Sequence, residues 1–177
     1  RNLMFTAYKT DRGPFVIRYP RGKGELRDWQ NEMELLPVGR GRRLREGTDV
    51  AVVTLGPIGN EARKAIESAV EEGISVAHYD MIYLKPIDED LLHEIGRNHT
   101  HVITVENGTI VGGLGTAVME FMMEHGYTPR VRRIGIPDRF IEHGTIAELN
   151  NLCGMDAPHI LQAIRAFATP AAKGGEA

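Results

Sequence analysis

Hydrophobic residues recur along this chain with two spacings, and the alternation between them predicts the fold. Four short runs rich in β-branched residues are typical of buried strands: residues 50–55, 74–81, 102–105 and 131–136. Hydrophobic residues at intervals of three and four indicate helices between and after these runs: residues 60–72, 89–97, 117–122, 145–152 and 156–168. Because strands alternate with helices, we expect parallel strands covered on both faces, which is a three-layer α/β sandwich.

A further strand is expected on the amino-terminal side of this unit. The basic segment 38–44 is joined to the hydrophobic run 50–55 by the short connection 45–49, and so short a connection predicts an antiparallel hairpin. The predicted sheet is therefore mixed and five-stranded, with four parallel strands and one antiparallel strand. Residues 15–20 are expected to form a separate strand, in which Pro20 prevents continued central pairing.

Several helix ends carry recognisable signals. Asp88 is placed as the N-cap of the helix at 89–97, and Thr145 with Glu148 has the form of a capping box. Gly73 and Gly154 follow the last turns of the predicted helices at 60–72 and 145–152, where glycine is favoured. These signals fix the helix boundaries more firmly than the hydrophobic spacing does.

A glycine-rich turn lies between the strand at 102–105 and the helix that follows it. Such a turn can present backbone N–H groups to a phosphate at a helix N-terminus. The glycines are Gly108, Gly112, Gly113 and Gly115, and they match neither G-x-G-x-x-G nor a P-loop. The favoured interpretation is that they let the helix pack close to the strand, and an anion cradle is the alternative.

Charge and composition narrow the class of protein. Through Gly47 the chain has 11 Lys and Arg against 6 Asp and Glu, a net charge of +5, whereas the remainder has 10 against 18, a net of −8. The acidic remainder makes nucleic acid an unsuitable partner. One cysteine, Cys153, suits a reducing compartment, and no run approaches the roughly 18 apolar residues of a membrane span. We expect a soluble, cytoplasmic protein without a membrane partner.

Candidate chemical groups are individually weak. His99 and His101 stand two apart, but further metal ligands are missing, so a solvated pair is favoured over a metal site. Asp138 and His143 share a loop that could carry acid–base chemistry, although a histidine bonded to backbone is the commoner outcome. Cys153 has no basic neighbour in sequence and is expected to be a buried small hydrophobe.

Glu106 and Asn107 follow the predicted central strand, at the edge where open parallel sheets bind ligands. A turn-forming Asn is the alternative interpretation of Asn107. The residues themselves predict no catalytic triad, cofactor ligand or metal motif.

Several motifs together resemble the 1-deoxy-D-xylulose-5-phosphate synthase family, thiamine-diphosphate enzymes of the transketolase superfamily. The similarity covers about residues 1–168. It is carried by the segments RNLMFTAYKTDRGPFVIRYPRG (1–22), LPVG (36–39), KPID (85–88), VEN (105–107), GGLG (112–115), GIPDRFI (135–141) and HG (143–144). The order and separation of IRYPRG and GIPDRFI make this resemblance specific.

The resemblance implies an activity and a domain division. The family condenses pyruvate with D-glyceraldehyde 3-phosphate on thiamine diphosphate and Mg²⁺, with loss of CO₂, and its product feeds isoprenoid, thiamine and pyridoxal synthesis. By this resemblance residues 1–22 end the second, pyrimidine-binding domain, residues 23–36 form a linker, and residues 37–168 form a transketolase C-terminal-like domain. Residues 169–177 are expected to be a disordered tail.

The chain has no initiator methionine and begins with residues typical of the end of a helix, so we expect a fragment of a longer protein. Its implied partners are the missing N-terminal domains and a second subunit, since the family forms homodimers. The resemblance places the family's cofactor and metal ligands outside the chain, and we expect the fragment alone to bind no cofactor and to be inactive.

Few functional residues carry over to this chain. The family's phosphate-anchoring arginine matches Arg21, with Arg18 as a second candidate, although a salt bridge within its own domain is the favoured role for Arg18. Two alternatives remain open at this stage: a stand-alone module whose glycine turn binds an anion, and a module that serves only for dimerisation.

Overall fold

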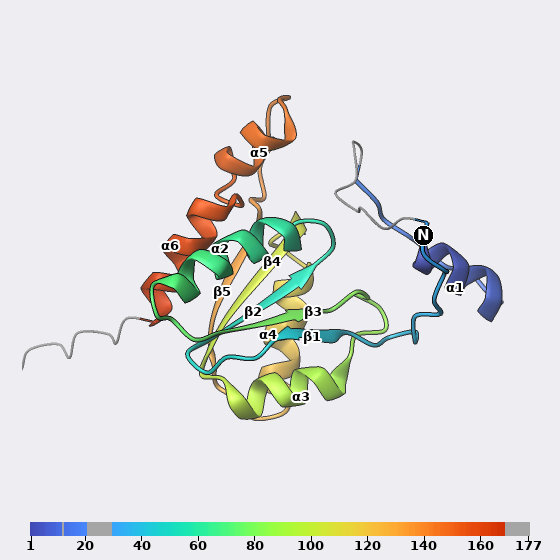
Figure 1. Ribbon diagram of the computed structural model, residues 1–177, viewed down its shortest axis with the longest axis horizontal. Coiled ribbons are helices and arrows are strands. Elements are labelled where there is room, and N and C mark those ends of the chain that lie inside the picture. The colour runs from blue at the N-terminus through green and yellow to red at the C-terminus, as the bar shows by residue number, and fades with distance from the viewer. Residues whose placement is uncertain (12, 21–29, 169–177) are drawn as a thin grey trace, which may run out of the picture.

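The computed structural model describes residues 1–11, 13–20 and 30–168 (Figure 1). Its elements in chain order are α1 (Asn2–Thr10), β1 (Arg42–Arg45), β2 (Val50–Leu55), α2 (Gly59–Glu71), β3 (Val76–Asp80), α3 (Glu89–Asn98), β4 (His101–Thr109), α4 (Leu114–Glu124), β5 (Arg130–Ile136), α5 (Ile146–Leu152) and α6 (Ala157–Ala168). The expected tail, residues 169–177, lies outside the described residues, as do residues 21–29 of the expected loop and linker.

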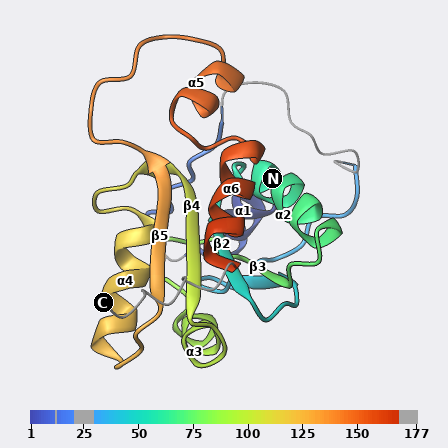
Figure 2. The same ribbon diagram turned by 90° about the vertical axis from the view of Figure 1, so that its left-hand side faces the viewer.

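The strands form one mixed sheet in the order β1-β3-β2-β4-β5, in which β1 is antiparallel to β3 and the other pairs are parallel. Helices cover both faces (Figures 1 and 2). Hydrophobic residues of α2 and α6 pack on one face, and those of α3 and α4 pack on the other. The predicted three-layer α/β sandwich with four parallel strands and one antiparallel strand is confirmed.

The predicted hairpin between the first two strands is wrong, because β1 pairs with β3 rather than with β2. All four residues of β1 are exposed, which suits a sheet edge, whereas β2 is buried and takes a parallel partner on each side. The connection between β1 and β2 passes over the start of β3, where the backbone N–H of Asp49 donates to the Ser75 carbonyl at 2.8 Å. A Cβ on Gly47 would lie 2.2 Å from the Val76 backbone, so this crossing requires glycine.

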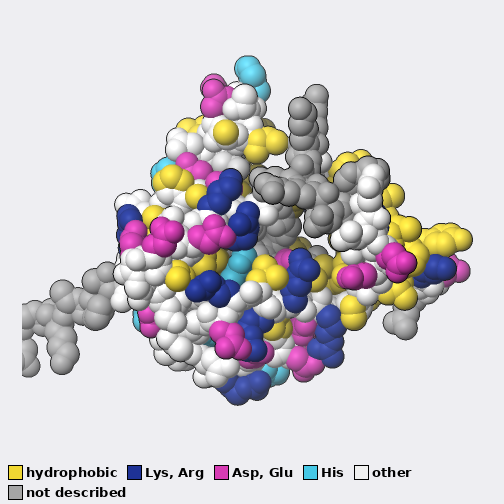
Figure 3. Space-filling model, viewed as in Figure 1, with side chains coloured by type: hydrophobic (Ala, Val, Ile, Leu, Met, Phe, Trp, Pro, Cys, Tyr) yellow, Lys and Arg dark blue, Asp and Glu magenta, His cyan; other side chains and the backbone are white. Residues whose placement is uncertain are grey.

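The strand predicted at 15–20 is also absent, since residues 14–20 form neither helix nor strand. No strand among the described residues lies alongside this segment to pair with it. Val16 and Tyr19 are 93% and 82% exposed, and Tyr8 on the neighbouring helix α1 is 80% exposed. Figure 3 shows hydrophobic side chains gathered over this amino-terminal part, at the right of the view.

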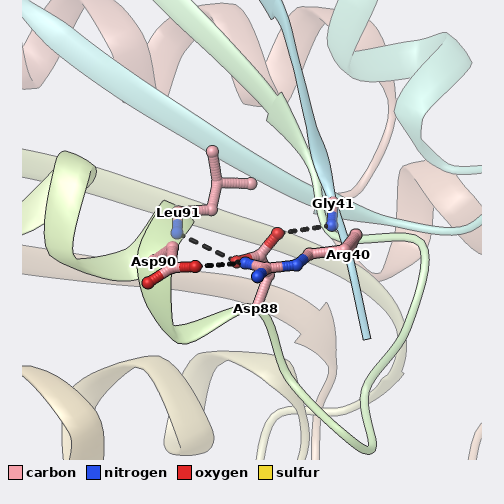
Figure 4. A network of polar contacts seen from close by, with 5 residues as sticks. All are labelled: Arg40, Gly41, Asp88, Asp90 and Leu91. Atoms are coloured by element: carbon pink, nitrogen blue, oxygen red, sulfur yellow. Dashed lines mark hydrogen bonds and ion pairs between the residues drawn. The ribbon is translucent and has the colours of Figure 1, made fainter. Parts of the chain in front are cut away.

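The predicted helix caps are present. Asp88 accepts a hydrogen bond from the backbone N–H of Leu91 at 3.1 Å, and its second oxygen accepts from Gly41 at 2.8 Å (Figure 4). Arg40 bonds to Asp88 at 3.2 Å and pairs with Asp90, so this carboxylate joins the start of α3 to the entry of β1. Thr145 and Glu148 form the predicted capping box of α5.

Candidate functional site at the carboxyl edge of the sheet

The carboxyl ends of the four parallel strands meet at one edge of the sheet, where folds of this kind bind their ligands. The loops that leave this edge are 56–58, 81–88, 110–113 and 137–145. Several residues that the sequence singled out lie at this edge: Glu106 and Asn107 near the end of β4, and Asp138 and His143 in the loop after β5. The geometry of this edge therefore decides what those residues can do.

Glu106 is buried, with 4% of its surface exposed, and its carboxylate faces the amino end of α4. One carboxylate oxygen accepts from the backbone N–H of Leu114 at 2.9 Å, and the other accepts from Gly115 at 3.0 Å. A Cβ on Gly113 would lie 2.2 Å from the Glu106 carboxylate, so glycine is needed for this close approach. The glycine-rich turn holds the protein's own carboxylate at the place where an anion would bind.

Asn107 makes the corresponding contact with the other helix layer. Its side-chain oxygen accepts from the backbone N–H of Ile58, the N-cap of α2, at 3.0 Å. The interpretation of Asn107 as a turn-forming residue is wrong, because β4 continues to Thr109 and only its pairing with β5 becomes irregular beyond Val105. Two successive residues of β4 thus bind the starts of helices on opposite faces of the sheet.

The remaining part of the glycine-rich turn is held by side-chain hydrogen bonds. Arg133 on β5 donates to the Ile110 carbonyl at 2.6 Å and to the Thr116 hydroxyl at 3.2 Å. The Thr116 hydroxyl also accepts from the backbone N–H of Gly112 at 3.1 Å. This part of the edge is built as a rigid support, and it does not fit the anion cradle considered from the glycine pattern.

The expectation of a solvated His99–His101 pair is wrong for His99. This residue is 5% exposed and its Nε2 lies 3.0 Å from the hydroxyl of Tyr79, whereas its Nδ1 has no hydrogen-bond partner among the described residues. Burial lowers the pKa of His99, which favours its neutral form. His101 is half-buried and packs edge-on against Phe167. His99 precedes β4, and the hydrophobic spacing of that strand could not show that the His99 ring packs against Tyr79.

Asp138 and His143 are both exposed, and neither forms a hydrogen bond with another residue in the described part of the chain. The alternative of a backbone bond to His143 is therefore not found there, and the loop provides no assembled acid–base pair. Cys153 is partly buried and packs against the hydrophobic core under α6, in agreement with its expected role. No group of three or more His, Cys, Asp or Glu among the described residues could hold a metal ion.

The two candidate phosphate-binding arginines differ in what the structure shows. Arg21 lies outside the described residues. Arg18 is exposed and forms no ion pair with any described residue, so the salt bridge that was favoured for it is not found there. Arg18 follows closely after Phe15, whose ring packs edge-on against that of Tyr83 at 6.1 Å between centroids.

Tyr83 anchors the amino-terminal part to the domain, and sequence reasoning missed it. Its hydroxyl donates to the carbonyl of Leu36 at 3.4 Å, and the N–H of Leu36 donates to the Thr6 hydroxyl on α1 at 2.9 Å. Tyr83 is 7% exposed and follows Ile82, whose φ of 55° is rare for a β-branched residue. Such strained turns are common at functional sites, and the positive φ had no signal in the sequence.

None of the helices in the described part of the chain has the length and hydrophobicity needed to cross a membrane. Two features of the described residues bear on function: the sheet edge locked by Glu106 and Asn107, and the amino-terminal segment docked through Tyr83.

Comparison with known proteins gives consistent matches. Residues 39–160 match the family described as transketolase, C-terminal domain. Curated relatives named 1-deoxy-D-xylulose-5-phosphate synthase include proteins of Parabacteroides distasonis, 64% identical over 93% of this chain, and of Azobacteroides pseudotrichonymphae, 62% identical over 93%. Each match covers 26% of the relative, so the chain spans about a quarter of their length.

Two solved structures share the fold. A split-gene transketolase, whose description is "inactive beta4 tetramer", aligns with 76% of this chain and 44% of its own. The identity is 36% and the TM-score is 0.70. A transketolase from Campylobacter jejuni aligns with 72% of this chain and 18% of its own, at 14% identity and a TM-score of 0.55. The second similarity concerns the fold alone.

Proposed function

The chain belongs to the transketolase C-terminal domain family, and on that basis we propose that it is the carboxyl-terminal part of a 1-deoxy-D-xylulose-5-phosphate synthase. The observation that carries this proposal is the 64% identity to a relative of that name, sustained over 93% of the chain. A match over 165 of 177 residues must include most of the segment before residue 39, which lies outside the matched family domain. A general transketolase-like scaffold would not by itself favour this one activity.

The proposed enzyme joins pyruvate to D-glyceraldehyde 3-phosphate with loss of CO₂, and it thereby supplies a precursor of isoprenoids, thiamine and pyridoxal. Thiamine diphosphate with Mg²⁺ would supply the carbon–carbon bond chemistry. The described residues do not fit this group: the N–H groups at the starts of α2 and α4 bind Asn107 and Glu106, and no cluster of oxygen ligands is available for Mg²⁺. We assign cofactor binding to parts of the enzyme outside this chain.

In the proposed enzyme, this chain would bind the acceptor substrate and support the dimer. Arg21 would hold the phosphate of the acceptor, because a guanidinium can bond to two phosphate oxygens at once, and Arg18 would lie near it. Residues 1–22 would complete the second domain, residues 23–36 would link the domains, and residues 37–168 would support a homodimer. The exposed apolar residues on α1 and the segment after it support this division, since the rest of the second domain would cover them.

The proposal is tested by exchanging chains. This chain replaces the aligned carboxyl-terminal quarter of the Parabacteroides distasonis relative, and the purified hybrid is supplied with both substrates, thiamine diphosphate and Mg²⁺. We expect it to form 1-deoxy-D-xylulose 5-phosphate, and we expect the relative without its last quarter, and this chain alone, to form none. A folded hybrid that releases no product, while the intact relative does, would contradict the proposal.

A further inference from the structure

A groove of about 320 Å³ runs between the edge strand β5 and helix α6, on the α6 side of the sheet. In Figure 2, β4 is drawn between β5 and α6, and α5 lies beyond their upper ends. Arg132 and Ile134 line it from β5, Arg139 from the loop that follows, and His159 and Gln162 from α6. None of its lining residues is acidic. The groove has the size of a small-molecule site, and every charged residue in its described lining is basic.

Two arginines of β1 provide a comparison for those of this groove. Arg42 pairs with Asp80 at 2.9 Å and Arg43 pairs with Glu94 at 2.7 Å. In contrast, Arg132 and Arg139 are exposed, and within the described ranges 1–11, 13–20 and 30–168 neither guanidinium group forms an ion pair or hydrogen bond. Two guanidinium groups thus line one groove with their donors unused.

His159 is oriented by a neighbouring carboxylate. Its Nδ1 bonds to Asp156, and Asp156 in turn accepts from the backbone N–H of His159 at 3.2 Å and from the side chain of Asn151 at 2.8 Å. The His159 side chain remains 43% exposed, whereas that of Asp156 is 16% exposed. Because Nδ1 is occupied by Asp156, Nε2 is the nitrogen left to meet a ligand in the groove.

We propose that the groove between β5 and α6 binds a phosphate or diphosphate group of a small molecule, held by Arg132 and Arg139 with His159 at its side. A phosphate offers several acceptor oxygens, and two guanidiniums can bond to it with paired donors. The groove meets the glycine-rich turn at Ile110 but not at Leu114 and Gly115, whose N–H groups bind Glu106. The proposal does not depend on the activity proposed above.

Arginines on an edge strand can also serve only to prevent pairing with other sheets. That role would account for Arg132, which lies on β5. It does not account for Arg139, which lies beyond the strand in the following loop, or for the oriented His159 on α6. The two roles give different outcomes in the following experiment.

The experiment titrates inorganic pyrophosphate into the isotopically labelled chain at constant ionic strength and follows the backbone amide resonances. We expect saturable shifts at groove residues such as Gly135 and Gly154, and little change at Leu114 and Gly115, whose N–H groups bind Glu106. Shifts that grow linearly without saturation, or that centre on other basic surfaces, would overturn the proposal. This measurement needs no variant and so does not depend on how well a variant folds.

Two substitutions then assign the binding. Arg132→Gln and Arg139→Gln should each weaken pyrophosphate binding by about tenfold or more, because each removes a charge-assisted contact. Arg97→Gln, at the exposed end of α3 on the opposite face of the sheet, is the matched control and should leave the affinity unchanged. Equal weakening by all three would indicate general electrostatic attraction and contradict the proposal. Self-association of Arg132→Gln with unchanged affinity would assign the arginine to edge protection instead.

Discussion

Glu106 is a buried carboxylate at the amino end of α4, and its two hydrogen bonds satisfy N–H groups that no other backbone group could satisfy. Glu106→Gln keeps one acceptor oxygen but turns an NH₂ group toward the other donor, and it removes the charge that the helix end favours. We expect a loss of about 1–3 kcal/mol of unfolding free energy. Urea unfolding of Glu106→Gln and of Glu120→Gln, an exposed residue of the same helix, measures this. A loss no larger than that of Glu120→Gln would refute the capping role.

The two buried histidines make stability depend on pH. Burial lowers the pKa of His78, and Arg42 and Arg63 lower it further while Asp80 raises it. Burial likewise lowers the pKa of His99, and Glu94 raises it. Since the unfolded chain titrates near 6.5, it binds more protons than the folded chain just below that pH. The stabilising effect is therefore complete above about pH 6.5 and is lost as the pH falls toward the lower folded pKa values.

We expect the urea concentration at the unfolding midpoint to decrease as the pH is lowered from 7.5 to 5. His99→Gln should make this decrease smaller, because it removes one of the two titrating groups. His143→Gln, which changes an exposed histidine, should leave the dependence as it is. The same slope in wild type and in His99→Gln would show that His99 does not titrate differently in the folded state.

At the scale of elements, local rules predicted most of the fold. The caps at Asp88 and Thr145, the inward faces of the helices and the four parallel strands follow from signals within one turn or one run of sequence. The predicted pairing of β1 with β2 was wrong because strand pairing depends on residues distant in sequence. β1 pairs with β3, since the buried β2 already has two parallel partners. Gly47, where the chain passes close to Val76, is the one local sign of this connection.

The candidate site was less predictable for the same reason. Glu106 and Asn107 were singled out by their place after the strand, but their bonding partners lie in α4 and α2, and no local pattern specifies those contacts. Tyr83 had no signal at all, since its partners Phe15 and Leu36 are far from it in sequence. Residues 14–20 form no strand here because pairing needs a neighbour that the described residues do not include.

The docking of α1 through Tyr83 can be tested by hydrogen exchange. Tyr83→Ala removes both the ring contact with Phe15 and the bond to Leu36, so the amides of α1 and of Leu36 should exchange faster, whereas those of β4 should not change. Tyr83→Phe keeps the ring contact and should have a smaller effect. In the unaltered chain, residues 1–22 should be less protected than Val102–Glu106. Equal protection of these two segments, or an unchanged α1 in Tyr83→Ala, would contradict this account.

At the scale of the whole molecule, the proposed enzyme divides two kinds of work between its parts. The described residues provide a rigid α/β support whose sheet edge is locked by Glu106 and Asn107, and a docked amino-terminal segment that carries Arg18. Cofactor chemistry is assigned to the remainder of the proposed synthase. This division implies that substitutions at the phosphate-binding residues of this chain should change the kinetics of the acceptor more than those of pyruvate, because only the acceptor carries a phosphate.

The most direct measurement is therefore steady-state kinetics of the hybrid enzyme with Arg21→Ala, in which both substrates are varied. Loss of a charge-assisted bond of about 1.5–3 kcal/mol should lower kcat/KM for D-glyceraldehyde 3-phosphate by roughly ten- to a hundredfold, with the KM for pyruvate nearly unchanged. Arg21→Lys should fall between wild type and Arg21→Ala, since it restores charge without the planar fork. An equal rise in the pyruvate KM, or the same loss with an unphosphorylated aldehyde, would contradict the role assigned to this chain.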